Sequence, residues 1–271
     1  MNDEMMMKAA ADIAASIGAR AIVSYTKRID MDADIPVIWV RELQMDVVQD
    51  LTMPDILEMC EQHLLDTAIQ IYLQKRLEHG LVVGVFPYAI LIFDIEEGKN
   101  FIRLQDFEDI VPREVMFSVL SLAMQIAVEG REGRTIGTAF IIGEGETILR
   151  NSHQAILNPY EGQHKAVCDV KNPENWESIK ELAQLDGIFV VNRDGFILAS
   201  GRYLDASARD VVLPGGLGGR HRATAAITRE HPVIGVTVSE SGGTIRVFRE
   251  GEVKISIRPH ERRSPSGPTP L

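Results

Sequence analysis

The sequence DGIFVVNRDGFILA, residues 186–199, decides the fold expected for the second half of the chain. The apolar run Ile188–Val191 is typical of a buried strand, and an acid and a glycine precede it. Residues 192–195 are turn formers, and a second apolar run follows at Phe196–Ala199. Two apolar runs joined by such a turn predict a β-hairpin, so we expect this half to be built around a sheet.

Further helices and strands are predicted on both sides of the hairpin. Proline is tolerated in the first turn of a helix, so Pro112 can open a helix that runs to Val128. The glycine-rich loop 214–219 leads into a helix that ends near Glu230. The remaining predictions are a helix over 173–184 and strands over 135–142, 233–238, 244–248 and 253–257.

The first half alternates helical and strand patterns. An alanine-rich helix is predicted over 9–17, with Gly18 as its C-cap, after a disordered start at residues 1–7. A wide apolar stripe predicts a second helix over 54–77. Helices that alternate with apolar strands imply a three-layer α/β domain with a mainly parallel sheet. The strands are expected at 21–25, 35–40, 81–86 and 89–95.

The domain organisation follows from length and local composition. A chain of 271 residues has a prior of roughly two domains. Acidic and polar residues between Glu96 and Asp109 mark a boundary, so the predicted domains are 1–111 and 112–258. Residues 259–271 are basic and proline-rich and are expected to be a disordered tail.

Composition and charge exclude several classes of protein. The balance of 45% hydrophobic and 25% charged residues is that of a globular protein. A net charge of −11 disfavours a nucleic acid polymer as partner, although a local basic cluster could still hold a small nucleotide. Cys60 and Cys168 form no disulfide or zinc pattern, and we find neither a signal peptide nor a run long enough to span a membrane. We therefore expect a soluble, cytoplasmic protein.

The loop 213–222 is the first candidate site. Its glycines leave backbone N–H groups accessible, and the helix that follows favours an anion at its N-terminus. Arg220 and Arg222 carry forked donors suited to phosphate, and His221 could add a protonated donor. Residues two apart on a helix point roughly 200° apart, so the two arginines serve different groups unless Arg220 still lies in the loop. The alternative is a flexible loop before a solvated basic helix.

Two acidic positions are the other candidates. Asp186, followed by Gly187 at a strand mouth, could bind a metal or orient a hydroxyl, and Gly187 would let a ligand approach the backbone. Ser239 and Glu240 end another predicted strand, where the serine could donate to phosphate and the glutamate could bind a metal. The Asp-Gly pair is also common in simple turns, and the Ser-Glu pair alone is a weak signal. The chain has no GxxxxGK[ST], HExxH, GxSxG or complete GxGxxG motif.

Taken together and in this order, these motifs resemble the diadenylate cyclase (DAC) family over about residues 134–257. The family pattern is an Asp-Gly-Ala strand start, a glycine-rich stretch ending in Arg-His-Arg, and a strand ending in Ser-Glu. The first half resembles the C-terminal α/β domain of pyruvate kinase, through residues 11–23 and 35–38. The matching residues of the DAC pattern are Asp186-Gly187-Ile188, Leu213-Pro214, Gly218-Gly219-Arg220-His221-Arg222-Ala223 and Val238-Ser239-Glu240.

The resemblance implies a fold, a reaction and a set of roles. The C-terminal domain would have a mixed central sheet flanked by helices. Two ATP would be condensed into cyclic di-AMP and two pyrophosphates, in a homo-oligomer whose active sites face each other, with Mn²⁺ or Mg²⁺ bound. Asp186, Arg220, His221 and Arg222 would be catalytic, with Asp186 and Glu240 at the metal. Gly187, Ile188, Leu213, Gly218, Gly219, Ser239 and Glu240 would contact the nucleotide.

Two departures from the family pattern keep other functions open. Ile188 replaces the usual alanine, and Gly219 stands where many members carry threonine. The runner-up is therefore a non-catalytic sensor of adenine nucleotide or cyclic di-AMP. A third possibility is an oligomeric scaffold in which the glycine-rich loop is merely structural.

Overall fold

The computed structural model describes residues 3–29, 34–40, 52–74, 76–96, 102–130, 135–207, 211, 213 and 215–259. The chain divides into two compact units, and the division falls between Ile102 and Arg103. Residues 103–111 therefore group with the second unit, whereas the sequence predicts that the second domain begins at 112. The tail expected over 259–271 lies outside the described residues from 260 onward.

Unit 1 is an α/β layer with a mainly parallel sheet. Its strands lie in the order β2-β1-β3-β4, in which β1 runs parallel to β2 and β3, and β3 runs antiparallel to β4. The sequence predicted this parallel character. In chain order the elements are α1 (Asp3–Ile17), β1 (Ala21–Ser24), β2 (Val37–Trp39), α2 (Met53–Leu73), β3 (Leu81–Val85) and β4 (Ile90–Asp94).

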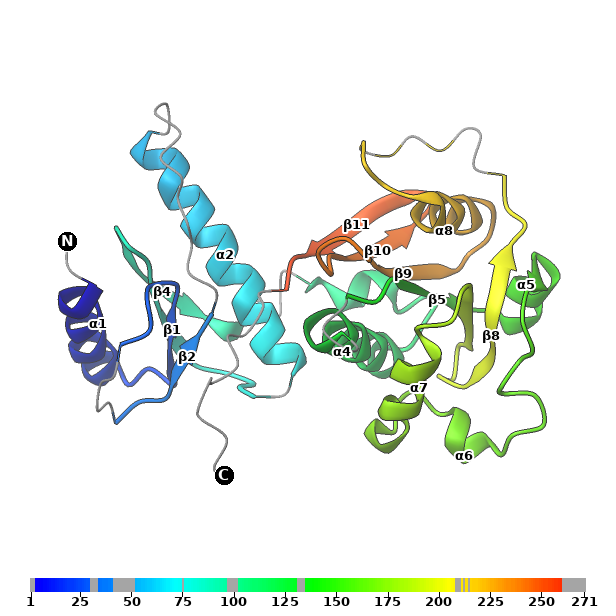
Figure 1. Cartoon of the computed structure of the whole chain (residues 1–271), viewed down its shortest axis with the longest axis horizontal. Coiled ribbons are helices and arrows are strands. Elements are labelled where there is room, and N and C mark those ends of the chain that lie inside the picture. Colours follow the sequence, from blue (N-terminus) through cyan, green and yellow to red (C-terminus); the bar gives the residue numbers. More distant parts are fainter. Residues whose placement is uncertain are drawn as a thin grey trace, which may run out of the picture. The chain divides into compact units, whose positions relative to one another are not determined.

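Helices cover both faces of this sheet (Figure 1). Side chains alternate between the faces of a strand, so neighbouring residues of β1 enter different cores. Ile22 packs with Met7 and Ala10 of α1, whereas Val23 packs with Leu64 of α2. Unit 1 therefore has the three layers that the sequence predicted.

The start of α1 corrects one prediction. Residues 1–7 were expected to be a disordered start, but the helix already begins at Asp3. Met6 and Met7 are 5% and 1% exposed and belong to the core with Ala10 and Ala14. Met6, Ala10 and Ala14 are spaced by four residues, so they extend one helical face toward the N-terminus. The helical face predicted from the sequence does not include Met6, because the methionine run is interpreted there as a disordered start.

Unit 2 is built on a mixed sheet of seven strands in the order β11-β10-β9-β5-β7-β8-β6. The pair β5 and β7 is parallel and the other pairs are antiparallel. The elements before the hairpin are η1 (Leu104–Phe107), α4 (Arg113–Glu129), β5 (Thr138–Gly143), α5 (Gly145–Arg150), β6 (Ser152–Gln154), α6 (Lys165–Cys168), η2 (Pro173–Asn175) and α7 (Trp176–Leu182). The hairpin and the elements after it are β7 (Ile188–Asn192), β8 (Ile197–Leu204), α8 (Gly219–Glu230), β9 (Ile234–Val238), β10 (Ile245–Arg249) and β11 (Glu252–Ile257).

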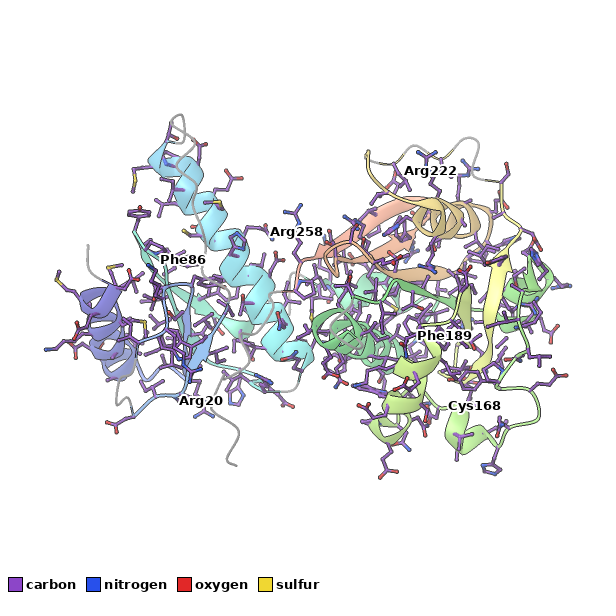
Figure 2. All side chains as sticks on the ribbon, in the orientation of Figure 1. Arg20, Phe86, Cys168, Phe189, Arg222 and Arg258 are labelled. Atoms are coloured by element: carbon purple, nitrogen blue, oxygen red, sulfur yellow. The ribbon has the colours of Figure 1, made fainter. Side chains whose placement is uncertain are left out.

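In unit 2, α8 covers one face of the sheet and α4 covers the other (Figure 1). Ile227 of α8 packs on one face with Ile141 and Val190. Phe140 and Phe189 stack on neighbouring strands with their ring centroids 4.9 Å apart, and Figure 2 shows Phe189 among the packed side chains of this unit. The mixed, helix-flanked sheet agrees with the sequence-based expectation.

The hairpin forms as predicted but is longer than expected. The N–H of Asn192 donates to the carbonyl of Phe196 at 2.9 Å, and Gly195 has a φ of +89°, which favours glycine in this turn. The strand expected to end at Ala199 continues to Leu204. In addition, α5, β6 and α6 were not predicted from sequence. In the part of the chain that the structure describes, no helix combines the length and the apolarity needed to cross a bilayer.

Candidate active site

A cavity of about 800 Å³ opens in unit 2 where several element ends converge. The start of β7 and the end of β8 form one wall, and the end of β9 with the turn after it forms another. The N-terminus of α8 borders the same space. The described lining residues are Asp186, Gly187, Ile188, Arg202, Tyr203, Leu204, Gly216, Gly218, Gly219, Arg220, His221, Ala223, Val238, Ser239, Glu240 and Ser241.

The fold gathers most of the residues singled out in the sequence around this cavity. Residues that lie far apart in the chain, such as Asp186, Arg220 and Glu240, line it together. Leu213 and Arg222 are not among the described lining residues. Arg222 is exposed, and Figure 2 shows its side chain on the outer side of α8. The two arginines of the Arg-His-Arg motif therefore face different surroundings.

Asp186 is held at the mouth of the cavity by three donors. The Tyr203 hydroxyl donates to Oδ2, and the Gly187 N–H donates to Oδ1 at 2.9 Å. Nη2 of Arg220 lies 3.5 Å from the same Oδ1. The Tyr203 hydrogen bond is the main reason why the pKa of Asp186 is lowered; the Gly187 N–H and the Arg220 charge act in the same direction, against partial desolvation. The carboxylate is thus ionised, and the Asp186 side chain is 68% exposed.

Gly187 allows the backbone of β8 to approach Asp186. Its φ is +103°, in the region where glycine is favoured. A Cβ placed there would lie 2.6 Å from the carbonyl carbon of Gly201 and 2.7 Å from the nitrogen of Arg202. The sequence suggested that this glycine makes room for a ligand, whereas in the structure the adjacent strand takes that room. Gly187 therefore sets the position of the carboxylate before it.

The N-terminus of α8 provides a positive wall. Gly218 is the N-cap and contributes no side-chain acceptor to the first-turn N–H groups, and Gly218, Gly219 and Arg220 line the cavity at this positive end of the helix dipole. The Arg220 side chain is 28% exposed beside them. A Cβ on Gly137 would lie 2.9 Å from both Nη1 of Arg220 and Cβ of Glu240, so the missing side chain lets these residues come close. A helix start next to a guanidinium is a site for a phosphate.

His221 is part of the wall but is turned toward the interior. It is 7% exposed, its ring contacts Phe248 edge-on, and its Nε2 lies 3.5 Å from Nη1 of Arg246. Burial, followed by the charges of Arg246 and Arg220, lowers the pKa of His221 to about 4. These surroundings favour a neutral imidazole over the protonated donor considered from the sequence.

The remaining predicted residues have distinct surroundings. Ile188 is 4% exposed and packs in the core beside Val190, so its bulk is directed at least partly into the protein. The Ser239 hydroxyl is 3.3 Å from the Ser241 hydroxyl and carbonyl, at the end of β9. Glu240 is exposed at the rim, and its carbonyl accepts a hydrogen bond from the Thr135 hydroxyl.

Sequence reasoning missed the contribution of β8. Tyr203 binds Asp186 directly, and Arg202 fixes the strand beside it. The guanidinium of Arg202 donates to the Ser152 hydroxyl at 2.9 Å and to the Leu149 carbonyl at 2.8 Å. The signal in the sequence was the pair Arg202-Tyr203, polar and aromatic, two residues after the second apolar run of the hairpin.

The donor set of the cavity suits a hard divalent cation that is shared with phosphates. Asp186 and Glu240 place two carboxylates on one cavity that is also bordered by Arg220 and the start of α8. Mg²⁺ typically takes one or two carboxylates together with substrate phosphates and water. Among the described residues, no group of three or more ligating side chains forms an all-protein metal site. The residues therefore fit a cation that is bound jointly with a nucleotide.

Comparisons with known proteins match both units. Residues 125–253 match the family model DAC, described as "DisA bacterial checkpoint controller nucleotide-binding". Residues 5–96 match a model described as "Probable sensor domain DacZ_A", and the resemblance to the pyruvate kinase domain stays a prediction.

Two curated relatives are both named diadenylate cyclase. The protein of Methanocaldococcus jannaschii is 37% identical over 175 residues, which is 63% of this chain and 55% of the relative. The protein of Haloferax volcanii is 36% identical over 145 residues, which is 54% of this chain and 53% of the relative. The chain thus spans about half the length of the curated relatives it matches.

Solved structures give more distant matches. DacA from Staphylococcus aureus, crystallised as a double mutant, is 21% identical with a TM-score of 0.35, and the match covers 52% of this chain and 84% of that one. A hypothetical membrane-spanning protein from Bacillus cereus is 14% identical with a TM-score of 0.40, over 60% of this chain and 76% of that one. The second unit therefore matches the DAC family model through residues 125–253, and two relatives named diadenylate cyclase match the chain.

Proposed function

We propose that this protein is a diadenylate cyclase, which condenses two ATP into cyclic di-AMP and two pyrophosphates. The observation that carries the proposal is the cavity in which an ionised Asp186 faces Arg220 and the start of α8. A carboxylate opposite a phosphate-binding wall is the arrangement that joining a hydroxyl to a phosphate requires. The two relatives named diadenylate cyclase support the same assignment.

The proposed reaction consists of two equivalent phosphoryl transfers. The 3′-oxygen of each ATP attacks the α-phosphorus of the other, and the bond from that phosphorus to the β-phosphate oxygen breaks. Each 3′-hydroxyl loses its proton and each ATP loses pyrophosphate. Such transfers depend mainly on positioning and on neutralisation of charge.

The chain's own residues take separate parts in this scheme. Asp186 orients the 3′-hydroxyl and lies where it can receive its proton. Arg220 and the first turn of α8 hold phosphate oxygens, and the Ser239 hydroxyl is a further donor. The contact between Arg220 and Asp186 is long, at 3.5 Å, so an arriving phosphate can replace it at little cost. The neutral His221 supports Arg246 and the wall of the cavity.

A divalent cation, Mn²⁺ or Mg²⁺, is part of the proposal. Asp186, with Glu240 at the rim, would hold it together with the phosphates. When bound, the cation neutralises phosphate charge and stabilises the leaving pyrophosphate.

The reaction also needs a second copy of the chain. A cavity of about 800 Å³ has the size of a site for one nucleotide, whereas the product joins two. Two copies would therefore present their cavities to each other in an isologous contact. Arg222, exposed and outside its own cavity, is available to the nucleotide of the partner.

A cytoplasmic location, where ATP is made, stays a prediction.

Binding and turnover measured side by side separate this enzyme from a sensor. Calorimetry gives the affinity for ATP with Mn²⁺, and chromatography with mass detection gives cyclic di-AMP. An enzyme binds ATP and forms product. ATP binding without product would favour the sensor. The departures from the family pattern at Ile188 and Gly219 are what the sequence offers in support of that alternative. Failure to bind any adenine nucleotide would contradict both.

A further inference from the structure

Tyr203 reaches the proposed catalytic carboxylate from the neighbouring strand. It lies near the end of β8, lines the cavity and is 41% exposed. Its hydroxyl donates to Oδ2 of Asp186. A phenol carries an O–H donor and an ionised carboxylate only accepts, so Tyr203 is the donor in this hydrogen bond.

The Tyr203 ring is itself held in place. Tyr203 pairs across the sheet with His153 of β6, and the two rings meet edge to face with centroids 5.8 Å apart. His153 is fixed in turn by Asp205, whose Oδ1 lies 2.6 Å from the histidine Nδ1. Arg202 ties the same stretch of β8 to Ser152 and Leu149. The phenol is consequently attached to a braced part of the sheet edge.

This arrangement sets the orientation of the Asp186 carboxylate. Oδ1 accepts from the Gly187 N–H and faces Arg220, while Oδ2 accepts from Tyr203. Each carboxylate oxygen has two acceptor positions, so Oδ2 can still take a substrate hydroxyl or a cation, and Oδ1 can do so when Arg220 moves to a phosphate. Without the Tyr203 hydroxyl, Oδ2 would lose the donor that limits rotation of the carboxylate about the Cβ–Cγ bond. The carboxylate would then rotate more freely, because this torsion is soft.

We propose that Tyr203 is a positioning residue for Asp186 and that its hydroxyl, rather than its ring, supplies this function. The inference rests on the proposed cyclase activity for its kinetic consequence. Tyr203 does not touch the reacting atoms in this scheme. It limits the carboxylate to the orientation in which its free acceptor positions face the cavity, as preorganised sites require.

The first test is Tyr203→Phe, which removes the hydroxyl and keeps the ring against His153. Loss of a hydrogen bond to a charged group should lower kcat by about tenfold to a hundredfold. KM for ATP should change by less than about threefold, because Tyr203→Phe leaves Arg220 and the start of α8 intact. Tyr88→Phe is the matched control, since Tyr88 is 53% exposed in unit 1. An unchanged kcat for Tyr203→Phe would overturn the proposal.

A double-mutant comparison distinguishes positioning from a separate role. In the Asp186→Asn background, adding Tyr203→Phe should cause no further loss of the residual activity, because Tyr203 acts through that carboxylate. If the double variant instead lost activity by the product of the two single-variant losses, the two residues would act independently, which would contradict the proposal.

A third measurement does not depend on activity. In protein labelled with carboxyl-¹³C aspartate, the Asp186 signal is assigned as the one missing from Asp186→Asn. Tyr203→Phe should shift this signal and Tyr88→Phe should not. If the wild type forms no cyclic di-AMP, the proposed function fails, yet this signal still tests the contact. An unmoved Asp186 signal in Tyr203→Phe would overturn the inference on its own.

Discussion

Gly187 lies directly against the backbone of Gly201, so closely that a Cβ on Gly187 would be 2.6 Å from the Gly201 carbonyl carbon. Both glycines have positive φ values, +103° and +69°. Their approach brings the end of β8 alongside the residue that precedes β7. This contact places Tyr203 opposite Asp186 and so shapes the rim of the cavity.

Gly187→Ala is predicted to destabilise the protein and to abolish turnover. The new methyl group meets backbone atoms, which cannot move aside as a side-chain end can, and the φ of +103° is strained for alanine. We expect a loss of about 1–3 kcal/mol in the free energy of unfolding, measured by urea titration. Gly215→Ala is the control, because a Cβ there meets nothing within 4 Å. Equal stability of the two variants would contradict this account of Gly187.

Arg220→Ala and Arg222→Ala are predicted to fail in different ways. Arg220 lines the cavity beside Asp186, so its loss should weaken ATP binding, seen in calorimetry as a Kd raised about tenfold or more. Arg222 is exposed outside its own cavity, so its loss should leave the Kd for ATP nearly unchanged and reduce turnover. If both variants lost ATP affinity equally, the assignment of the two arginines to different nucleotides would be wrong.

The hairpin of β7 and β8 shows which parts of this site the sequence predicted and which it did not. The turn at 192–195 and the two strands were correct, and Val191 pairs with Ile197 as a simple hairpin requires. Counting along the strands without interruption would then set Ile188 opposite Ser200. The structure pairs Ile188 with Arg202, because two register shifts intervene. Such irregularities depend on packing that local patterns do not encode, and Tyr203 was missed for this reason.

Other differences have equally local causes. The separated motifs Asp186, Arg220 and Glu240 were assigned to one site by resemblance to a family, and the fold does bring them to one cavity. Leu213 and Arg222 are not among the described lining residues. For Arg222 the reason is the turn of α8, which directs position 222 outward (Figure 2). The burial of Met6 and Met7 was missed because a methionine run at a chain start resembles a disordered leader.

Acid is predicted to destabilise unit 2 through His221. The pKa of this residue is about 4 in the folded protein and 6.5 for the free side chain, so the unfolded chain binds the proton more readily. Stability contributed by the neutral ring is therefore complete above pH 6.5 and is lost as the pH falls toward 4. The slope from this one group is at most about 1.4 kcal/mol per pH unit.

Urea titrations between pH 4 and pH 7 measure this dependence. His221→Gln should flatten the curve relative to the wild type, because glutamine does not titrate in this range. The same slope in both proteins would show that other groups, and not His221, cause the acid sensitivity.

Removal of divalent cations is predicted to stop product formation. The cavity offers two carboxylates and no complete protein-only site among the described residues, so the cation should be held weakly without nucleotide. A brief treatment with a chelator followed by gel filtration should therefore suffice, and added Mn²⁺ or Mg²⁺ should restore activity. Full activity after chelation would remove the cation from the proposed reaction.

The most direct test of the central claim is the stoichiometry of the products. The purified protein is incubated with ATP and Mn²⁺, and cyclic di-AMP and pyrophosphate are quantified in the same samples beside an Asp186→Ala variant. The account predicts two pyrophosphates for each cyclic di-AMP in the wild type and neither product from the folded variant. Cyclic di-AMP from Asp186→Ala at the wild-type rate, or no cyclic di-AMP from a wild type that binds ATP, would contradict it.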